Sequence, residues 1–412
     1  MLTFSRVPAG VCSNRGTEMN CRICGANVTE PVVNLGNIPL VNNLTATPEA
    51  DVKMFPLDVL FCTSCNVAQL RDSVPPEEMF SEYLFYSCAM APVVARAKEL
   101  VDRLMAVRRF PQLVIEIASN DGYLLDGYRK RGVKTLGIDP ARGPANAAAI
   151  KGVPTVQEFF GLALAKTLPK ADVIHANNVL AHVPDPNDFV AGIAEILQPH
   201  GICFVEVPYL KDLLIGAHFD TIYHEHLFYH SIKSLVTLFS RHGLIVTNVE
   251  RLPDVLGGSL RISVEKRGIT TAEVDGDLNF SEMQRRTDYY AASLRDTLAR
   301  LKAEGKSVWG FGAAAKTTVM LNYANVLPGM LDAVADDTPA KQGKYIPGTD
   351  VQVCSTQDWL KAQPDYTCIF TWNYANMIAH KFAQDYKGTF FSSMWTEYAH
   401  APEARINGRR VR

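Results

Sequence analysis

The stretch Gln112-Leu-Val-Ile-Glu-Ile-Ala-Ser-Asn-Asp-Gly122 decides the fold of this chain. Residues 112–118 form a largely apolar run with β-branched side chains, which is typical of a central strand in a parallel sheet. Residues 119–122 are polar and end in glycine, so they break the strand, and residues 123–131 then have the pattern of a helix. A strand, a tight turn and a helix in this order open a doubly wound α/β sheet.

The alternation of strand and helix continues on both sides of this stretch. Strands are predicted at 134–139, 172–177 and 201–207, and helices at 91–107, 141–151 and 188–197. Two further strands, at 245–249 and 259–264, are expected to close the sheet as an antiparallel pair. The sequence therefore predicts one Rossmann-like α/β domain over residues 87–267.

A second cycle of strands and helices follows. A long amphipathic helix is predicted at 281–304, and a strand at 307–311 leads into a helix that reaches residue 323. Further strands are predicted at 331–335, 366–371 and 389–393. The sequence thus predicts a second Rossmann-like α/β domain over residues 268–412.

Two CxxC pairs precede both α/β domains. Cys21-Arg-Ile-Cys24 is separated by 37 residues from Cys62-Thr-Ser-Cys65. Four thiolates in two close pairs suit a tetrahedral Zn²⁺ ion, and a set of four protein ligands leaves no open coordination position. We therefore predict a structural zinc site in a ribbon-like domain over residues 1–86, with strands at 31–35 and 57–61. Disulfides are the alternative, but a thiolate–metal site and free cysteines indicate a reducing, cytoplasmic compartment.

Length and composition exclude several classes of protein. A chain of 412 residues is long enough for two or three domains of roughly 100–200 residues each. Its net charge of −2 argues against a dedicated nucleic-acid binder, and no apolar run reaches the roughly 18 residues of a membrane helix. Residues 1–18 lack a hydrophobic segment, so we expect a flexible extension or a mis-called start and not a signal peptide.

The turn after the first strand is the candidate cofactor loop. A nucleotide-like ligand binds naturally there, over a helix N-terminus at the carboxyl ends of parallel strands. The turn contains Asn120, Asp121 and Gly122. Asp139, at the end of the second strand, is placed to accept hydrogen bonds from a ribose. The stretch lacks G-x-G-x-x-G, and an acid such as Glu116 can face a cationic amino-acid group, so S-adenosylmethionine suits the loop better than a dinucleotide. A loop that only turns the chain is the alternative.

A second glycine-rich turn, Gly310-Phe-Gly312-Ala-Ala-Ala315, follows the strand at 307–311. It is similar to the G-x-G-x-x-A pattern of dinucleotide sites, which is a weak signal on its own. Lys316 comes directly after it, so helix-start amides and an ammonium group converge and favour a phosphate. A nucleotide-sugar diphosphate and NAD both satisfy these features, and a packing role for the glycines is the remaining alternative.

The densest group of ionisable and aromatic side chains spans residues 220–230 and includes Tyr223, Glu225 and His226. An imidazole has a pKa near working pH and the adjacent Glu225 can orient it, so we predict that His226 acts as a general base. His182 follows the strand at 172–177 and is expected at the same edge of the sheet. The alternatives are a metal site built from the histidines, a surface cluster, and a core histidine at position 182.

These motifs occur in one order along the chain, and together they resemble the nucleotide-sugar C-methyltransferases, three-domain enzymes that make branched deoxysugars. The resemblance also rests on residues 177–182, 257–261 and 337–342. It implies a structural zinc domain, a middle domain that binds S-adenosylmethionine, and a C-terminal domain that binds the nucleotide diphosphate of a 4-keto-6-deoxysugar. The nucleotide would be TDP or GDP, and C-3′ is the methylated carbon most common in the family.

The resemblance also implies roles for individual residues. His226 matches the family's base, and Tyr223, Glu225 and His182 match its supporting residues. The expected cofactor ligands are Glu116, Ala118, Asn120, Asp121, Gly122, Asp139, Pro140, Phe160, Asn177 and Asn178. The expected substrate ligands are Tyr86, Lys316, Thr317, Asn322, Asp337, Lys341, Gln342, Trp372 and Asn373.

Two positions depart from the family pattern. Ala118 stands where methyltransferases usually have glycine, so the backbone approaches the cofactor less freely. Phe85 occupies the position of an active-site tyrosine that follows the zinc domain, and Tyr86 replaces that hydroxyl only if the backbone shifts. Residue 85 therefore offers no hydroxyl for proton transfer.

The expected reaction is methylation of a carbon next to a ketone. His226 removes the proton α to the 4-keto group, and the enolate carbon attacks the methyl group of S-adenosylmethionine. Tyr223 and His182 are the candidate donors to the enolate oxygen, and one such donor contributes about 3–4 kcal/mol. An NAD-dependent nucleotide-sugar oxidoreductase and a non-catalytic zinc-ribbon adaptor are the alternatives. We expect a monomer or weak homo-oligomer that binds no nucleic acid and no membrane.

Overall fold

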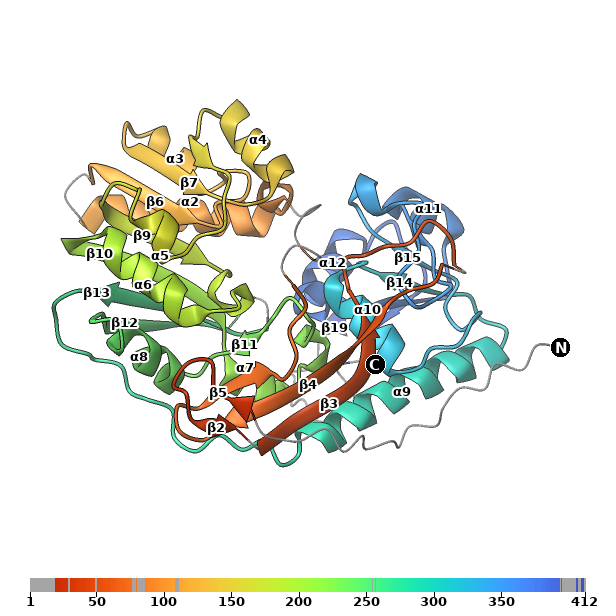
Figure 1. Ribbon diagram of the computed structural model, residues 1–412. Helices are drawn as coiled ribbons and strands as arrows, with labels where there is room; N and C mark the ends of the chain where they lie inside the picture. Colours follow the sequence, from red (N-terminus) through yellow and green to blue (C-terminus); the bar gives the residue numbers. More distant parts are fainter. Residues whose placement is uncertain are drawn as a thin grey trace.

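The computed structural model of the chain has three sheets of four or more strands within the part that it describes (Figure 1). It describes residues 19–28, 30–48, 50–75, 79, 86–107, 111–253, 255, 257–392, 394, 405–406 and 409–410. The predicted extension at residues 1–18 and the departure at Phe85 lie outside the described residues.

The largest sheet has seven strands in the order β12-β13-β10-β9-β6-β7-β8. Its parallel core consists of β6 (Leu113–Ile117), β7 (Lys134–Ile138), β8 (Thr155–Val156), β9 (Ala171–Asn177) and β10 (Leu197–Pro208). The edge strand β12 (Ile245–Leu252) and β13 (Ser259–Glu265) follow, and β13 runs antiparallel to both of its neighbours. The doubly wound α/β fold and the closing antiparallel pair are thus confirmed.

Side chains of this sheet alternate between two apolar layers, because successive residues of a strand face opposite ways. Val114, Val173 and Phe204 pack in one cluster with α2 (Ala91–Val107), α3 (Leu125–Arg129) and part of α4 (Arg142–Ile150). Ile115, Ile174 and Val205 pack on the other face. That face is covered by α5 (Leu162–Ala165), α6 (Pro186–Ile196) and α8 (Ile232–Ser240).

The C-terminal sheet is fully parallel, with the strand order β16-β15-β14-β17-β18. Its strands are β14 (Val308–Phe311), β15 (Ala333–Ala335), β16 (Val353–Cys354), β17 (Tyr366–Ile369) and β18 (Thr389–Phe391). Its helices are α9 (Met283–Ala303), α10 (Ala315–Tyr323), α11 (Thr356–Ala362) and α12 (Ala375–Lys381). This arrangement confirms the second Rossmann-like unit, although β16, α11 and α12 were not predicted from the sequence.

The N-terminal unit is a four-stranded sheet with the order β11-β5-β4-β3. It consists of β3 (Glu30–Pro39), β4 (Met54–Cys62), β5 (Val67–Leu70) and β11 (Phe228–Tyr229), next to a short hairpin of β1 (Met19–Asn20) and β2 (Asn27–Val28). The strand β11 comes from the middle of the chain and pairs Tyr229 with Ala68. Residues just before β11 are therefore held by the N-terminal sheet.

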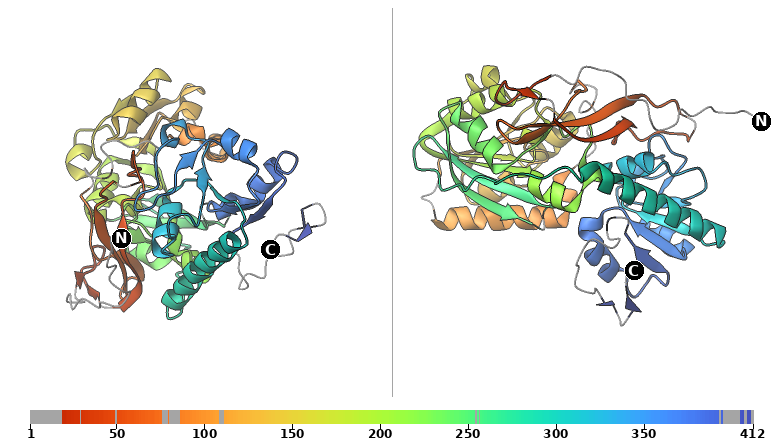
Figure 2. Two further views of the ribbon diagram at one scale, coloured as in Figure 1. Left: turned by 90° about the vertical axis from the view of Figure 1, so that its right-hand side faces the viewer. Right: turned by 90° about the horizontal axis from the view of Figure 1, so that it is seen from below.

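The helix α9 joins the units in space. It contacts β3 on one side and β14 on the other, and Figures 1 and 2 show it lying between the N-terminal strands and the C-terminal sheet. The backbone N–H of Asn34 donates a 2.8 Å hydrogen bond to Gln284 of this helix. The domain boundaries predicted at residues 86 and 267 remain predictions.

Short elements complete the described part of the chain. They are α7 (Leu210–Gly216), the 3₁₀ turns Ser87–Ala89, Leu180–His182, Phe219–Thr221, Pro339–Lys341 and Trp372–Tyr374, and the strand pair β19 (Arg405–Ile406) and β20 (Arg409–Arg410). Four of the five 3₁₀ turns carry residues of the candidate site, so irregular backbone positions much of it.

Candidate active site

The four predicted zinc ligands converge in the N-terminal unit. The Sγ atoms of Cys21, Cys24, Cys62 and Cys65 all lie within 4.8 Å of one another, and both Cys21–Cys65 and Cys24–Cys62 are 3.6 Å apart. Four sulfurs at about 2.3 Å from one Zn²⁺ would be spaced by just under 4 Å in a tetrahedron. A disulfide needs about 2.05 Å, and all four cysteines are free. The donor set therefore fits a closed zinc site.

The candidate cofactor loop follows β6 in strained backbone. Ala118, Asn120 and Gly122 have φ values of +57°, +49° and +72°. The positive φ at residue 122 favours glycine, and a side chain there would also lie close to Val153, at 3.1 Å. At residue 118 the left-handed conformation explains why glycine is the usual choice, and Ala118 adopts it at some cost in strain.

Asp139 holds the candidate cofactor loop at the end of β7 by hydrogen bonds. Its two carboxylate oxygens accept backbone N–H groups of Asn120 at 2.7 Å and of Ala141 at 2.9 Å. Burial raises the pKa of Asp139, and these two backbone donors act in the opposite direction. The residue predicted to bind a ribose thus has a supporting role in the protein itself. Each oxygen keeps a second lone pair for a ligand, so the ribose contact stays a prediction.

Buried side-chain oxygen atoms without a hydrogen-bond partner gather at the carboxyl ends of β6 and β9. In the described part of the chain, neither carboxylate oxygen of Glu116 has a hydrogen-bond partner, nor do the amide oxygens of Asn177 and Asn178. Burial holds the pKa of Glu116 well above its usual range; Asp139 and Asp121 add to that shift and Asn177 opposes it. Unpaired buried acceptors call for a donor-rich ligand, and the ammonium group of S-adenosylmethionine is one.

Asn120 and Asp121 hold a neighbouring segment in place. The amide oxygen of Asn120 accepts the backbone N–H of Ser87 at 2.9 Å, and the carboxylate of Asp121 accepts that of Cys88 at 3.1 Å. The preceding residue, Tyr86, is partly exposed, and its hydroxyl lies against Gly143 at the start of α4. The segment that follows the zinc domain therefore lies on the cofactor loop, and Tyr86 as a substrate ligand stays a prediction.

Two further predicted cofactor residues lie beside the loop. Phe160 packs edge-on against Phe189 of α6 with ring centroids 5.4 Å apart, and Pro140 follows Asp139 at the end of β7. The cofactor roles of Phe160 and Pro140 stay predictions.

His226 is held in a defined tautomer. Its Nδ1 lies 3.0 Å from the backbone oxygen of Thr221, which only accepts hydrogen bonds, so Nδ1 carries the proton. Its Nε2 lies 2.9 Å from the hydroxyl of Tyr223, which then donates to it. The ring of His182 meets that of His226 edge-on, with centroids 4.9 Å apart. Nε2, which carries the free lone pair of the ring, is thus the basic atom of His226.

The surroundings keep this imidazole neutral. Burial lowers the pKa of His226 well below its usual range, with His182 and Lys316 in the same direction and the Thr221 carbonyl opposing them. Burial also lowers the pKa of His182 to about 4. Both rings are therefore unprotonated near neutral pH, which is the form that a base requires.

The carboxyl group of Glu225 bonds to the N-terminal unit and not to His226. The amide Nδ2 of Asn42 donates to it at 2.5 Å, and burial raises its pKa to about 7. The idea that Glu225 orients His226 was therefore wrong in detail, since the Thr221 carbonyl does so. His224 and His230 point elsewhere, toward Pro56 and Ser234. Within the described residues the cysteines form the one group of metal-binding type, which leaves the histidine metal site without support.

Residues of the C-terminal unit contact the same loop. The indole N–H of Trp372 donates a 2.7 Å hydrogen bond to the buried carboxylate of Asp220. The Lys316 ammonium lies 4.5 Å from the centroid of the Trp372 ring and 3.1 Å from the amide oxygen of Asn373. Asp220 directly precedes Thr221, whose carbonyl bonds to His226, so these contacts connect the predicted phosphate-binding lysine to the stretch that carries the predicted base.

The other predicted substrate ligands have partners inside the C-terminal unit. Thr317 donates to the Gly312 carbonyl, Asn322 to those of Thr318 and Pro347, and Gln342 to that of Asp336. Lys341 donates to the carbonyl of Ala313, and Asp337 pairs with Lys381. The bonds of Thr317, Lys341 and Gln342 shape the loops at the carboxyl ends of β14 and β15, and substrate contacts of all these residues stay predictions.

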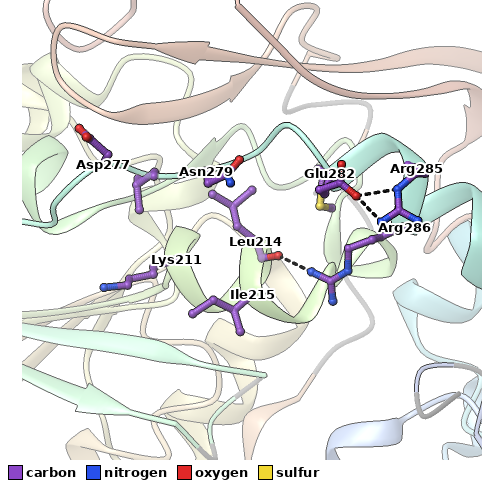
Figure 3. A pocket seen from close by; sticks show the side chains of 10 residues that line it. Lys211, Leu214, Ile215, Asp277, Asn279, Glu282, Arg285 and Arg286 are labelled. Carbon is purple, nitrogen blue, oxygen red and sulfur yellow. Dashed lines mark hydrogen bonds and ion pairs between the residues drawn. The ribbon is translucent and has the colours of Figure 1, made fainter. Parts of the chain in front are cut away.

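A surface pocket of about 580 Å³ lies apart from these residues (Figure 3). It lies between α7 and the start of α9, and Arg286 there donates to the backbone oxygen of Leu214 at 3.1 Å. Its lining includes none of the predicted catalytic, cofactor or substrate residues.

Comparison with known proteins identifies the family. The chain is 33% identical over 386 residues to the C-methyltransferase NovU of Streptomyces niveus, covering 87% of this chain and 90% of that protein. It belongs to the C-methyltransferase family. Family models match in chain order: "Putative zinc binding domain" at residues 21–80, "Methyltransferase domain" at 83–249 and "C-methyltransferase C-terminal domain" at 254–393.

Other similarities are more limited. The ubiquinone biosynthesis O-methyltransferase of Histophilus somni is 29% identical over 22% of this C-methyltransferase and 42% of its own length. The crystal structure of magnesium protoporphyrin IX methyltransferase from Synechocystis with bound S-adenosylmethionine has a TM-score of 0.34 at 14% identity, over 42% of this chain and 78% of that one. A similarity at that level carries no argument here. The family resemblance and the fold class inferred from the sequence are confirmed by NovU, the family models and the strand order.

None of the helices in the described part of this C-methyltransferase has the length and apolar character needed to cross a membrane.

Sequence reasoning missed three site residues of this C-methyltransferase. Asn42 lies 183 residues from its partner Glu225, and Thr221 acts through a backbone carbonyl that any residue supplies. Asp220 was noticed only as part of an ionisable stretch. No spacing rule relates these residues, because irregular loops bring them together.

Proposed function

We propose that this C-methyltransferase acts on a nucleotide-linked 4-keto-6-deoxysugar, carried by TDP or GDP, and methylates it at C-3′. One observation supports the reaction type above all: the Nε2 lone pair of a neutral His226 lies next to Tyr223 and His182. The resemblance to nucleotide-sugar C-methyltransferases supports the substrate class and the position.

His226 is the proposed base. Its Nε2 takes the proton α to the ketone, and the electron pair of that C–H bond moves onto the carbonyl oxygen as an enolate. The Thr221 carbonyl keeps the other ring proton on Nδ1, so the ring enters the reaction in its basic form. Tyr223, freed from Nε2, and His182 are placed to donate to the enolate oxygen, which compensates for the weak basicity of an imidazole.

The cofactor would be held by Glu116, Asn177 and Asn178 at the strand ends. When bound there, S-adenosylmethionine would supply an electrophilic methyl group for the enolate carbon and would be released as the thioether. The unpaired buried oxygens at this edge match the ammonium and hydroxyl donors of such a ligand. They orient it, and alignment with the sugar carbon contributes much of the rate.

Lys316, Trp372 and Asn373 are proposed to bind the diphosphate and sugar from the C-terminal side. Burial lowers the pKa of Lys316 and Asp220 opposes the shift, so the lysine is set in a partly apolar site where a phosphate interacts strongly. An NAD-dependent oxidoreductase and a zinc-ribbon adaptor find no support in the family models. We further propose a cytoplasmic monomer or weak homo-oligomer with structural Zn²⁺, and domain boundaries near residues 86 and 267.

The experiment is incubation with methyl-labelled S-adenosylmethionine and a panel of nucleotide-linked 4-ketosugars, read by mass. We expect one added methyl group on a TDP- or GDP-linked sugar, at carbon. Transfer to an oxygen atom, or to none of the ketosugars while an unrelated acceptor is methylated, would contradict the proposal.

A further inference from the structure

The loop that joins β3 to β4 in the zinc-binding unit contacts both other units. Thr45 exchanges two backbone hydrogen bonds, of 3.0 and 2.8 Å, with Tyr345 of the C-terminal unit. The hydroxyl of Thr318 on α10 donates at 3.2 Å to the backbone oxygen of Val41. Between these two anchors, Asn42 extends its amide to Glu225. The backbone of this loop is therefore fixed where it approaches the catalytic stretch.

Glu225 depends on this contact. Its side chain is 6% exposed, and in the described part of the chain Asn42 is the hydrogen-bond partner of its carboxyl group. A buried carboxylate without a donor loses its charge, because burial penalises the ionised form. The Asn42 amide donates to this carboxyl group, and the bond opposes the effect of burial on the pKa of Glu225.

The neighbouring titratable groups do not replace this donor. His182 contacts the backbone of Glu225, and His224 and His226 flank it in sequence. Burial lowers the pKa of all three imidazoles, so they are neutral near pH 7. Lys316 affects His226 but is not among the groups that shift the pKa of Glu225.

We infer that Asn42 is a positioning residue for Glu225, and that the zinc-binding unit thereby forms part of the catalytic centre. The inference rests on the proposed function for its kinetic consequence. The Asn42 amide favours the ionised form of the Glu225 carboxyl against the effect of burial, and it fixes the residue directly before His226. The N-terminal unit therefore does more than support the fold, because it sets the charge state of a residue in the reaction stretch.

Asn42→Ala tests this role, with Asn43→Ala as the matched control. Asn43 is exposed and its described bond is made by its backbone N–H to Leu40. We expect Asn42→Ala to lower kcat by about tenfold or more with little change in KM. Removing the donor raises the pKa of Glu225, so the acidic limb of the kcat profile moves to higher pH. Asn42→Gln, which keeps the amide, should restore part of the activity.

A second measurement needs no substrate and so separates this inference from the proposed function. Glutamate labelled with ¹³C at the side-chain carboxyl gives a signal for Glu225, which is assigned by its absence in Glu225→Gln. In the wild type it should titrate near pH 7, and in Asn42→Ala at higher pH. Equal titration in both proteins would overturn the inference, as would a fall in kcat that accompanies loss of zinc or of thermal stability.

Discussion

The indole N–H of Trp372 donates a hydrogen bond of 2.7 Å to the buried carboxylate of Asp220, across 152 residues of sequence. This bond joins the C-terminal unit to the stretch that carries His226. Gly257 makes the contact possible, because a side chain there would lie 2.6 Å from the Trp372 ring. The two α/β units thus meet at the site of the proposed reaction.

Replacing this tryptophan tests the junction. Trp372→Phe keeps an aromatic ring beside Lys316 but leaves the Asp220 carboxylate without its donor. We expect the free energy of unfolding to fall by about 1–3 kcal/mol and the KM for the nucleotide-sugar to rise. Urea unfolding and steady-state kinetics measure the two effects. The control is Trp309→Phe on β14, where no indole hydrogen bond is described, and wild-type values for Trp372→Phe would refute the junction.

Loss of the metal should reach the active site through the N-terminal sheet. Cys65 lies in the turn before β5, and β5 pairs with β11 directly after the catalytic stretch. Cys65→Ser, or chelation of zinc, is expected to cost about 3 kcal/mol or more of stability and most of the activity. Metal content, unfolding and turnover are measured together, with Cys354→Ser on β16 as control. A zinc-free protein of full activity would exclude this coupling.

The contribution of histidines that are buried in neutral form to stability should fall as the pH falls. Burial lowers the pKa of His175 to about 3, whereas the unfolded chain titrates near 6.5. Between these values the unfolded state binds one more proton, so the contribution of His175 is present above pH 6.5 and is lost as the pH decreases. One such group changes stability by about 1.4 kcal/mol per pH unit.

The variant His175→Gln isolates this effect. Its deficit relative to the wild type should shrink by about 2 kcal/mol between pH 7 and pH 5, as measured by urea unfolding. Groups whose pKa is raised in the folded protein, such as Glu225, contribute to the pH dependence of stability in the opposite direction. They are the same in both proteins, so their effect cancels in the comparison. The exposed His200 provides the control substitution. A deficit that is constant with pH would show that His175 is not buried as a neutral ring.

The sequence was sufficient for the sheets but not for the contacts between them. A largely apolar run at 112–118 and a short strand before a glycine-rich turn at 307–311 identified the first strand of each α/β unit, and the cysteine spacing identified the metal site. The strand β11 is only two residues long, so no period reveals it, and its partner Ala68 lies 161 residues earlier. Elements this short are formed by tertiary contacts and not by local preference.

The candidate site also contains residues that the sequence predicts and residues that only the fold brings into place. His226 and Lys316 were identified because histidine near neutral pKa and lysine after a glycine turn carry chemical meaning of their own. The roles of Asn42 and of the Thr221 carbonyl depend on their positions in space, since an asparagine in a loop or a backbone oxygen has no distinctive pattern. Glu225 shows the limit: its neighbourhood in sequence suggested His226 as partner, whereas the fold gives it Asn42.

The central claim is that the imidazole of His226 removes a proton from the sugar. Its most direct test is exchange of that proton with D₂O, measured by NMR on the accepted 4-ketosugar in the presence of S-adenosylhomocysteine, so that no methyl group is transferred. We predict deuterium at the carbon next to the ketone with the wild type and none above background with His226→Ala, while S-adenosylhomocysteine still raises the unfolding temperature of the variant. Exchange by His226→Ala at the wild-type rate would contradict the account.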